Sequence, residues 1–118
     1  MQIDMFLEQF KVLSPNVSND RWAKARIVKG QKRAIWTYLN STGRLIFLPC
    51  VVTLTRHGVK ELDYDNLVGS FKHVRDAVAD YIHPGLKPGQ ADDDPNITWV
   101  YAQVKCHRDK CGVQLRIV

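Results

Sequence analysis

The segment VVTLTRHGVKELDYDNLVGSFKHVRDAVADYI, residues 51–82, carries the sequence signals of a strand, a turn and a helix in succession. The β-branched and apolar residues of 51–55 predict a buried strand, and residues 57–60 predict the turn that ends it. From Asn66 to Ile82 apolar residues recur at helical spacing. The predicted buried stripe of this helix is Leu67, Phe71, Val74, Val78 and Tyr81 or Ile82.

Further elements flank this unit on both sides. Residues 18–20 offer N-cap candidates for a helix from about Arg21 to Leu39, whose apolar face would hold Ala25, Val28, Ile35 and Leu39. Residues 97–104 predict a strand, and 113–118 predict its antiparallel partner after a polar hairpin turn. Residues 3–7 alternate like a strand but also fit a helix. We therefore predict an α/β (α+β) fold, with a small mixed sheet of about three to four strands and two main helices packed on it, in one domain over residues 1–118.

The composition is typical of a soluble globular domain with a basic surface. The chain has 118 residues, a formal net charge of +5, 45% hydrophobic residues and 25% charged residues, values that argue against a disordered or fibrous protein. No apolar run approaches the roughly 20 residues of a membrane span, and the N-terminus lacks a signal-peptide pattern. We therefore expect a cytoplasmic protein without a membrane partner.

Neither the cysteines nor the glycines indicate a familiar cofactor site. The three cysteines, Cys50, Cys106 and Cys111, are an odd number that does not favour a disulfide framework. A structural zinc site needs four ligands, which Cys106, His107 and Cys111 do not supply. The chain has no phosphate-binding glycine loop, so we expect no nucleotide cofactor.

Basic residues line the first predicted helix. Arg26, Lys29 and Arg33 repeat at spacings of three and four, and Lys24 and Lys32 add charge beside them. Such a stripe is often only a solvated helix face. Because successive helical turns lie about 5.4 Å apart, it can also contact phosphates along a nucleic-acid strand. We interpret these five residues as candidate DNA-binding residues.

Carboxylates are gathered at both ends of the predicted helix of 66–82. Asp63 and Asp65 precede it, and the run 92–94 follows it, before a strand. Pairing the strand before Asp63 with the strand after Asp94 would bring the two groups together. Carboxylates held close together repel one another unless a cation lies between them, and oxygen ligands favour a hard cation such as Mg²⁺. Helix capping by Asp65 and a solvated Asp-Asp-Asp-Pro turn are the alternatives.

Lys72 lies two helical turns beyond Asp65, on the same face of the predicted helix. It could stabilise the charge that develops on a reacting phosphate. It could equally form only a surface pair with Asp76, four residues further on.

The segment Asp63-Tyr64-Asp65-Asn66-Leu67, the Phe71-Lys72 helix and Asp93-Asp94 before a strand resemble the RusA family of Holliday-junction resolvases. The resemblance implies a homodimeric crossover junction endodeoxyribonuclease, encoded by a phage or prophage and acting in the bacterial cytoplasm in DNA recombination and repair. Its cofactor would be Mg²⁺, with Mn²⁺ as a substitute, and its partner would be DNA, in particular four-way junctions.

The same resemblance assigns residues to the site. Asp63, Asp65 and Asp94 would be catalytic and would bind the metal, with Asp93 as a further metal ligand because the register within the acidic run is open. Lys72 would be the catalytic lysine, although Gly69 occupies the turn where the family's lysine is expected.

Two other classes of function remain open. One is a non-catalytic phage DNA-binding module that uses the basic first helix. The other is an assembly or regulatory protein without a nucleic-acid partner.

Overall fold

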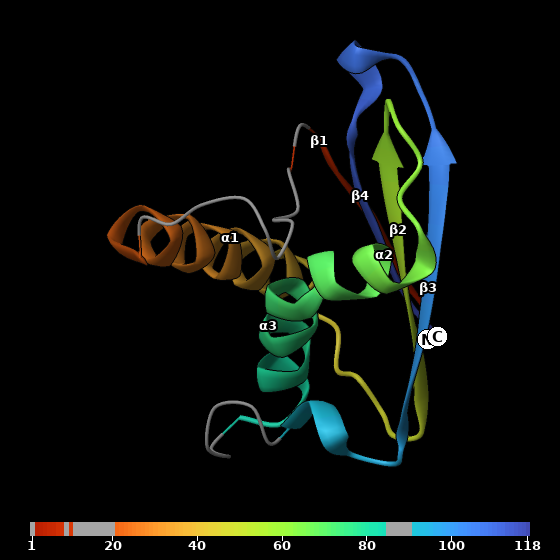
Figure 1. The fold of residues 1–118 in the computed structure, drawn as a ribbon. Helices are drawn as coiled ribbons and strands as arrows, with labels where there is room; N and C mark the ends of the chain where they lie inside the picture. The colour runs from red at the N-terminus through yellow and green to blue at the C-terminus, as the bar shows by residue number, and fades with distance from the viewer. Residues whose placement is uncertain (1, 9, 11–20, 85–90) are drawn as a thin grey trace.

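A four-stranded mixed sheet forms one layer of the protein (Figure 1). The structure, a computed structural model, describes residues 2–8, 10, 21–84 and 91–118. The strands are β1 (Ile3–Glu8), β2 (Cys50–Gly58), β3 (Ile97–Lys105) and β4 (Gly112–Ile117), in the spatial order β1-β4-β2-β3. β2 runs parallel to β3 and antiparallel to β4, and β4 runs antiparallel to β1. The prediction of a small mixed sheet is confirmed.

Three α-helices lie on one face of this sheet: α1 (Arg21–Thr42), α2 (Tyr64–Ser70) and α3 (Lys72–Ile82) (Figure 1). Two 3₁₀ turns, η1 (Ala91–Asp93) and η2 (Arg108–Lys110), precede and follow β3. α1 packs against α3, where the Trp36 indole donates a hydrogen bond to the Ala77 carbonyl at 2.9 Å. None of the helices in the described ranges is both long and apolar enough to cross a membrane.

The single helix predicted over residues 66–82 is instead two helices that meet at Phe71. Phe71 has φ −92° and ψ 3°, outside the helical region, and its N–H bonds to the Val68 carbonyl three residues back. Gly69 and Ser70 weaken the helix just before this point, because both have low helix propensity and the Ser70 hydroxyl bonds to the Leu67 carbonyl. The predicted buried stripe is nevertheless confirmed for Leu67, Phe71, Val74 and Val78.

The predicted hairpin between the last two strands is wrong. β3 and β4 are antiparallel, but β2 lies between them and pairs with both. The connection through η2 therefore crosses the C-terminal end of β2, where the Cys106 N–H donates to the Gly58 carbonyl at 3.0 Å. Turn-forming residues show that the chain reverses there, but they carry no information on whether another strand fills the gap.

The core lies between the sheet and the helices. Its buried residues come from every strand and every α-helix and include Ile3, Ile35, Leu39, Val52, Leu54, Phe71, Val78, Ile97 and Leu115. In α1 only Ile35 and Leu39 are buried, so the predicted apolar face fails at Ala25, which is exposed, and at Val28, which is half-buried. The first half of α1 extends past α3 and away from the sheet (Figure 1).

Phe71→Ala should lower the free energy of unfolding by about 3–5 kcal/mol, because it leaves a cavity where a fully buried ring now contacts Tyr101. Urea unfolding followed by circular dichroism measures this change. Phe47→Ala is the matched control: Phe47 is 69% exposed, and we expect a change within about 0.5 kcal/mol. Equal losses in the two variants would contradict the core described above.

Candidate functional site

Asp63 and Asp65 lie at the start of α2, where the chain has turned back from the end of β2. The Gln103 side chain on β3 fixes this return: it accepts a hydrogen bond from the Leu62 N–H at 2.9 Å and donates one to the Leu62 carbonyl at 2.7 Å. Asp63 follows in an extended conformation and is the N-cap residue of α2, and Asp65 lies in the first turn. The predicted N-cap role of Asp65 is therefore wrong by two positions.

The Asp63 and Asp65 carboxylates have few side-chain partners among the described residues. The Asp63 side chain makes no capping hydrogen bond, although it accepts one from the Asn66 side-chain amide. Both aspartates are exposed, and within the described ranges neither has a Lys, Arg or His ion-pair partner. Two carboxylates two residues apart thus face solvent in a chain of net charge +5, and no basic side chain of the described residues neutralises them.

The acidic run 92–94 is divided among separate contacts. Asp92 pairs with Arg75, with 3.3 Å between Oδ2 and Nε, whereas Asp93 is exposed. Asp94 contacts the His83 ring and accepts a hydrogen bond from the Asn96 N–H at 2.8 Å. That backbone hydrogen bond, followed by the contact with His83, lowers the pKa of Asp94.

The structure does not gather the two acidic groups into one cluster. Within the described part of the chain, no three His, Cys, Asp or Glu side chains lie close enough to hold a metal ion together. The predicted pairing of the flanking strands is present, but it is parallel. The C-terminal end of β2 and the N-terminal end of β3 therefore lie at opposite ends of the strands. Leu62 is hydrogen-bonded to Gln103, and Asp94 is hydrogen-bonded to Ile97. Gln103 and Ile97 lie about 20 Å apart along β3, since a strand rises about 3.3 Å per residue.

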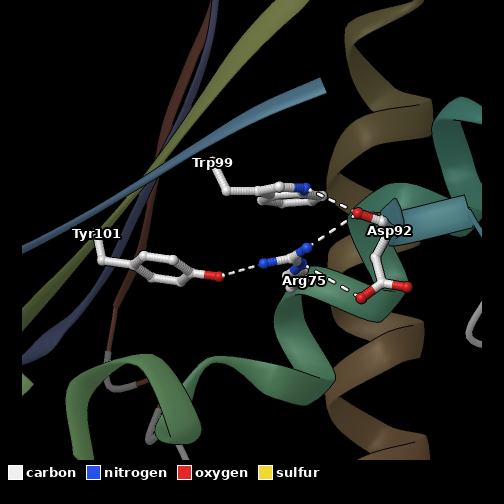
Figure 2. Close-up of polar contacts among 4 residues, drawn as sticks. All are labelled: Arg75, Asp92, Trp99 and Tyr101. Atoms are coloured by element: carbon white, nitrogen blue, oxygen red, sulfur yellow. Dashed lines mark hydrogen bonds and ion pairs between the residues drawn. The ribbon is translucent and has the colours of Figure 1, made fainter. Parts of the chain in front are cut away.

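Arg75 joins η1 to α3 and β3 (Figure 2). Its guanidinium donates to the Tyr101 hydroxyl at 2.8 Å and to the Asp92 carbonyl at 2.9 Å, and it stacks on the Trp99 ring with 4.8 Å to the centroid. The Trp99 indole donates to the same carbonyl at 3.2 Å. The planar guanidinium, which presents several donors in a fixed geometry, therefore sets the position of the acidic run.

Asp76 lies in a second group of charged residues, where α1, α3 and η1 meet. Burial, followed by the negative charge of Asp92, raises the pKa of Asp76, while Lys32, Lys72 and His73 act in the opposite direction. Burial, together with Lys24, Lys32 and Lys72, lowers the pKa of His73, against the effect of Asp76. Lys72 is exposed at the first position of α3 and so contributes charge to this group.

The predicted DNA-binding residues fall into two sets. Arg26, Lys29 and Arg33 are exposed on α1, whereas Lys24 and Lys32 are half-buried and act on the charged residues of α3.

The role of Arg75 was not predicted from the sequence, and Asp92 was predicted only as a member of the acidic run 92–94. Arg75 is separated from Asp92 by 17 residues and from Trp99 by 24, which left no local signal, since only the fold brings the three together.

Comparisons with known proteins leave the function to be argued from this geometry. No protein-family model matches the chain, and neither the curated proteins nor the solved structures include a match.

The Asp76 carboxyl should titrate above pH 3.8, the ordinary value for aspartate. Because the folded protein then holds this proton more tightly than the unfolded chain, the carboxyl's contribution to stability falls as pH rises through that region. An NMR titration of the Asp76 carboxyl carbon measures the pKa directly. In Lys32→Gln the midpoint should rise further, because a neighbouring positive charge is removed. A midpoint at or below 3.8 in the wild type would contradict the described surroundings.

Proposed function

We propose that the chain is a Mg²⁺-dependent endodeoxyribonuclease that nicks paired phosphodiester bonds in four-way DNA junctions. The observation that carries this proposal is the exposed pair Asp63 and Asp65. The Asp63 side chain makes no capping hydrogen bond, and neither carboxylate pairs with a basic side chain in the described ranges. The resemblance of this segment to RusA-type resolvases supplies the class of substrate.

The residues of this pair suit Mg²⁺. The ion is commonly held by one or two protein carboxylates, with waters and substrate phosphates completing its octahedral shell. Asp63 and Asp65 would hold it at the start of α2, and the Asn66 amide orients the Asp63 carboxylate. When bound, the ion would activate a water and stabilise charge on the phosphate.

Other residues would bind and orient the DNA. Lys72, exposed at the start of α3, would neutralise a phosphate near the site, as the resemblance implies. Arg26, Lys29 and Arg33, which are exposed on α1, would contact the backbone of a DNA arm. Asp94, with Asp93 beside it, is proposed as the third carboxylate through the resemblance alone.

We include a homodimer in the proposal, because paired nicks need two sites. The sheet face opposite the helices supports it: by strand alternation it carries Val51, Val100 and Val104, which are 40%, 41% and 45% exposed. Exposed valines of this kind, on a face that also carries polar residues such as Thr53 and Arg116, can contribute to packing against a second copy of the chain.

Asp63→Asn and Asp65→Asn should each reduce Mg²⁺-dependent nicking of a labelled four-way junction at least about 100-fold, since even partners of metal ligands commonly contribute 10–100-fold. Junction binding should persist in both variants. Glu61→Gln, which removes an exposed carboxylate two residues before Asp63, is the matched control and should keep full activity. Asp94→Asn, assayed alongside, tests the third carboxylate.

Reactions with EDTA and with matched duplex and flap DNA complete the assay. Nicking that survives EDTA, or both Asp→Asn substitutions, would overturn the proposal. Tight junction binding without any nicking would favour a DNA-binding module instead.

The separation of Asp63 and Asp65 from the run 92–94 favours this second candidate, a non-catalytic DNA-binding protein that uses α1. Both candidates require the exposed basic residues of α1, so their DNA binding must weaken as salt rises.

Replacing Arg26, Lys29 and Arg33 together by Gln should weaken duplex binding and reduce the slope of log affinity against log salt by about 0.9 for each phosphate that is no longer neutralised. Fluorescence anisotropy across a salt series measures the slope. Lys110→Gln, an exposed basic residue outside α1, is the single-charge control and should change the slope by less than the triple variant. Salt-independent binding in the wild type would exclude both candidates.

A further inference from the structure

Two cysteine side chains lie in contact where the chain passes from β3 to β4. Cys106 follows β3, Cys111 precedes β4, and their sulfur atoms are 3.7 Å apart. Both residues are partly exposed, whereas Cys50 is buried in the core. All three are free thiols.

The fold holds these two thiols together from both sides. β2 pairs with β3 and with β4, so the ends of those strands are fixed on either side of Gly58. The Cys106 N–H donates to the Gly58 carbonyl at 3.0 Å. Within the loop, the His107 carbonyl accepts the Lys110 N–H at 2.9 Å and the Cys111 thiol at 3.6 Å. The backbone around both cysteines is therefore set by the sheet and by local hydrogen bonds.

We propose that Cys106 and Cys111 are a redox-active dithiol, which low-molecular-weight disulfides oxidise to an intramolecular disulfide that closes the β3–β4 connection. This modification site is independent of the proposed nuclease function.

The exchange proceeds in two displacements, and its atoms and electrons balance. One cysteine thiolate attacks a sulfur of the small disulfide, forming a mixed disulfide and releasing one small thiolate. The second cysteine, after losing its proton to solvent, attacks the protein sulfur of the mixed disulfide and releases the second small thiolate. The two cysteines together lose two protons and two electrons, and the small disulfide takes up both.

The geometry suits this step better than a metal site. A disulfide needs its sulfurs at about 2.05 Å, and the two sulfur atoms are already in contact at 3.7 Å. A structural zinc ion needs four ligands, and in the described ranges no third His, Cys, Asp or Glu side chain completes a cluster with this pair.

Three neighbouring residues act on the Cys106 thiol besides its own burial. Burial raises its pKa first, followed by the hydrogen bond and charge of Cys111; Asp109 acts in the same direction, and the Arg56 guanidinium opposes them. Because only the thiolate reacts, oxidation should become faster as pH rises through the thiol range. The raised pKa lowers the fraction of thiolate at neutral pH and so slows the first displacement.

The test incubates the folded chain with glutathione disulfide over a series of ratios to reduced glutathione, with intact mass and free thiols measured after acid quenching. The wild type should lose two hydrogen atoms without gaining glutathione, and its thiol count should fall from three to one. Trypsin, which cleaves after Arg108 and Lys110, should then leave the two flanking peptides joined until a reductant is added.

Three variants make the result specific. Cys50→Ser should behave as the wild type and fall from two thiols to none. Cys106→Ser and Cys111→Ser should each stop at a glutathione adduct, with circular dichroism confirming that both are folded. A wild-type product that stops at the mixed disulfide, stays unreacted at the most oxidising ratio, or forms a disulfide-linked dimer would overturn the proposal.

Discussion

The parallel pairing of β2 with β3 is the constraint on which the rest of the structure depends. Two adjacent parallel strands cannot be joined by a tight turn, because the second strand begins at the end where the first strand began. The chain must return to that end through a long crossover. Residues 59–96 form this crossover, and α2 and α3 within it lie beside α1 in the helical layer over the sheet. Every residue proposed to be catalytic lies in the same segment.

That constraint also explains the distribution of the carboxylates. The crossover begins near the C-terminal end of β2 and finishes at the N-terminal end of β3, so its first and last residues lie at opposite ends of the strands. Asp63 is carried part of the way back by the Gln103 contacts with Leu62, whereas Asp94 stays beside Ile97. Arg75, in the middle of the crossover, stacks on Trp99 and binds Asp92 and Tyr101, so it links α3 to η1 and β3 (Figure 2).

Charge is arranged unevenly over this frame. Where α1, α3 and η1 meet, the partly buried Asp76 and His73 are surrounded by lysines and by Asp92, and their pKa values move away from the ordinary ones in opposite directions. Asp63 and Asp65 instead remain exposed, and Arg26, Lys29 and Arg33 of α1 are also open to solvent. Groups able to bind a cation and groups able to bind an anion therefore coexist on one small chain.

The sequence by itself determined the strand of β2 and much of the buried face of α2 and α3, because hydrophobic periodicity and turn residues are local signals. The strand over Val51–Thr55 and the stripe Leu67, Phe71, Val74 and Val78 were predicted in this way. The tertiary structure alone decided strand order, which placed β2 between β3 and β4. The connection that was expected to be a hairpin therefore passes over the end of β2 at Gly58. It also decided which distant side chains meet, such as Arg75 with Trp99. Such contacts depend on the packing of whole elements, which no window of neighbouring residues contains.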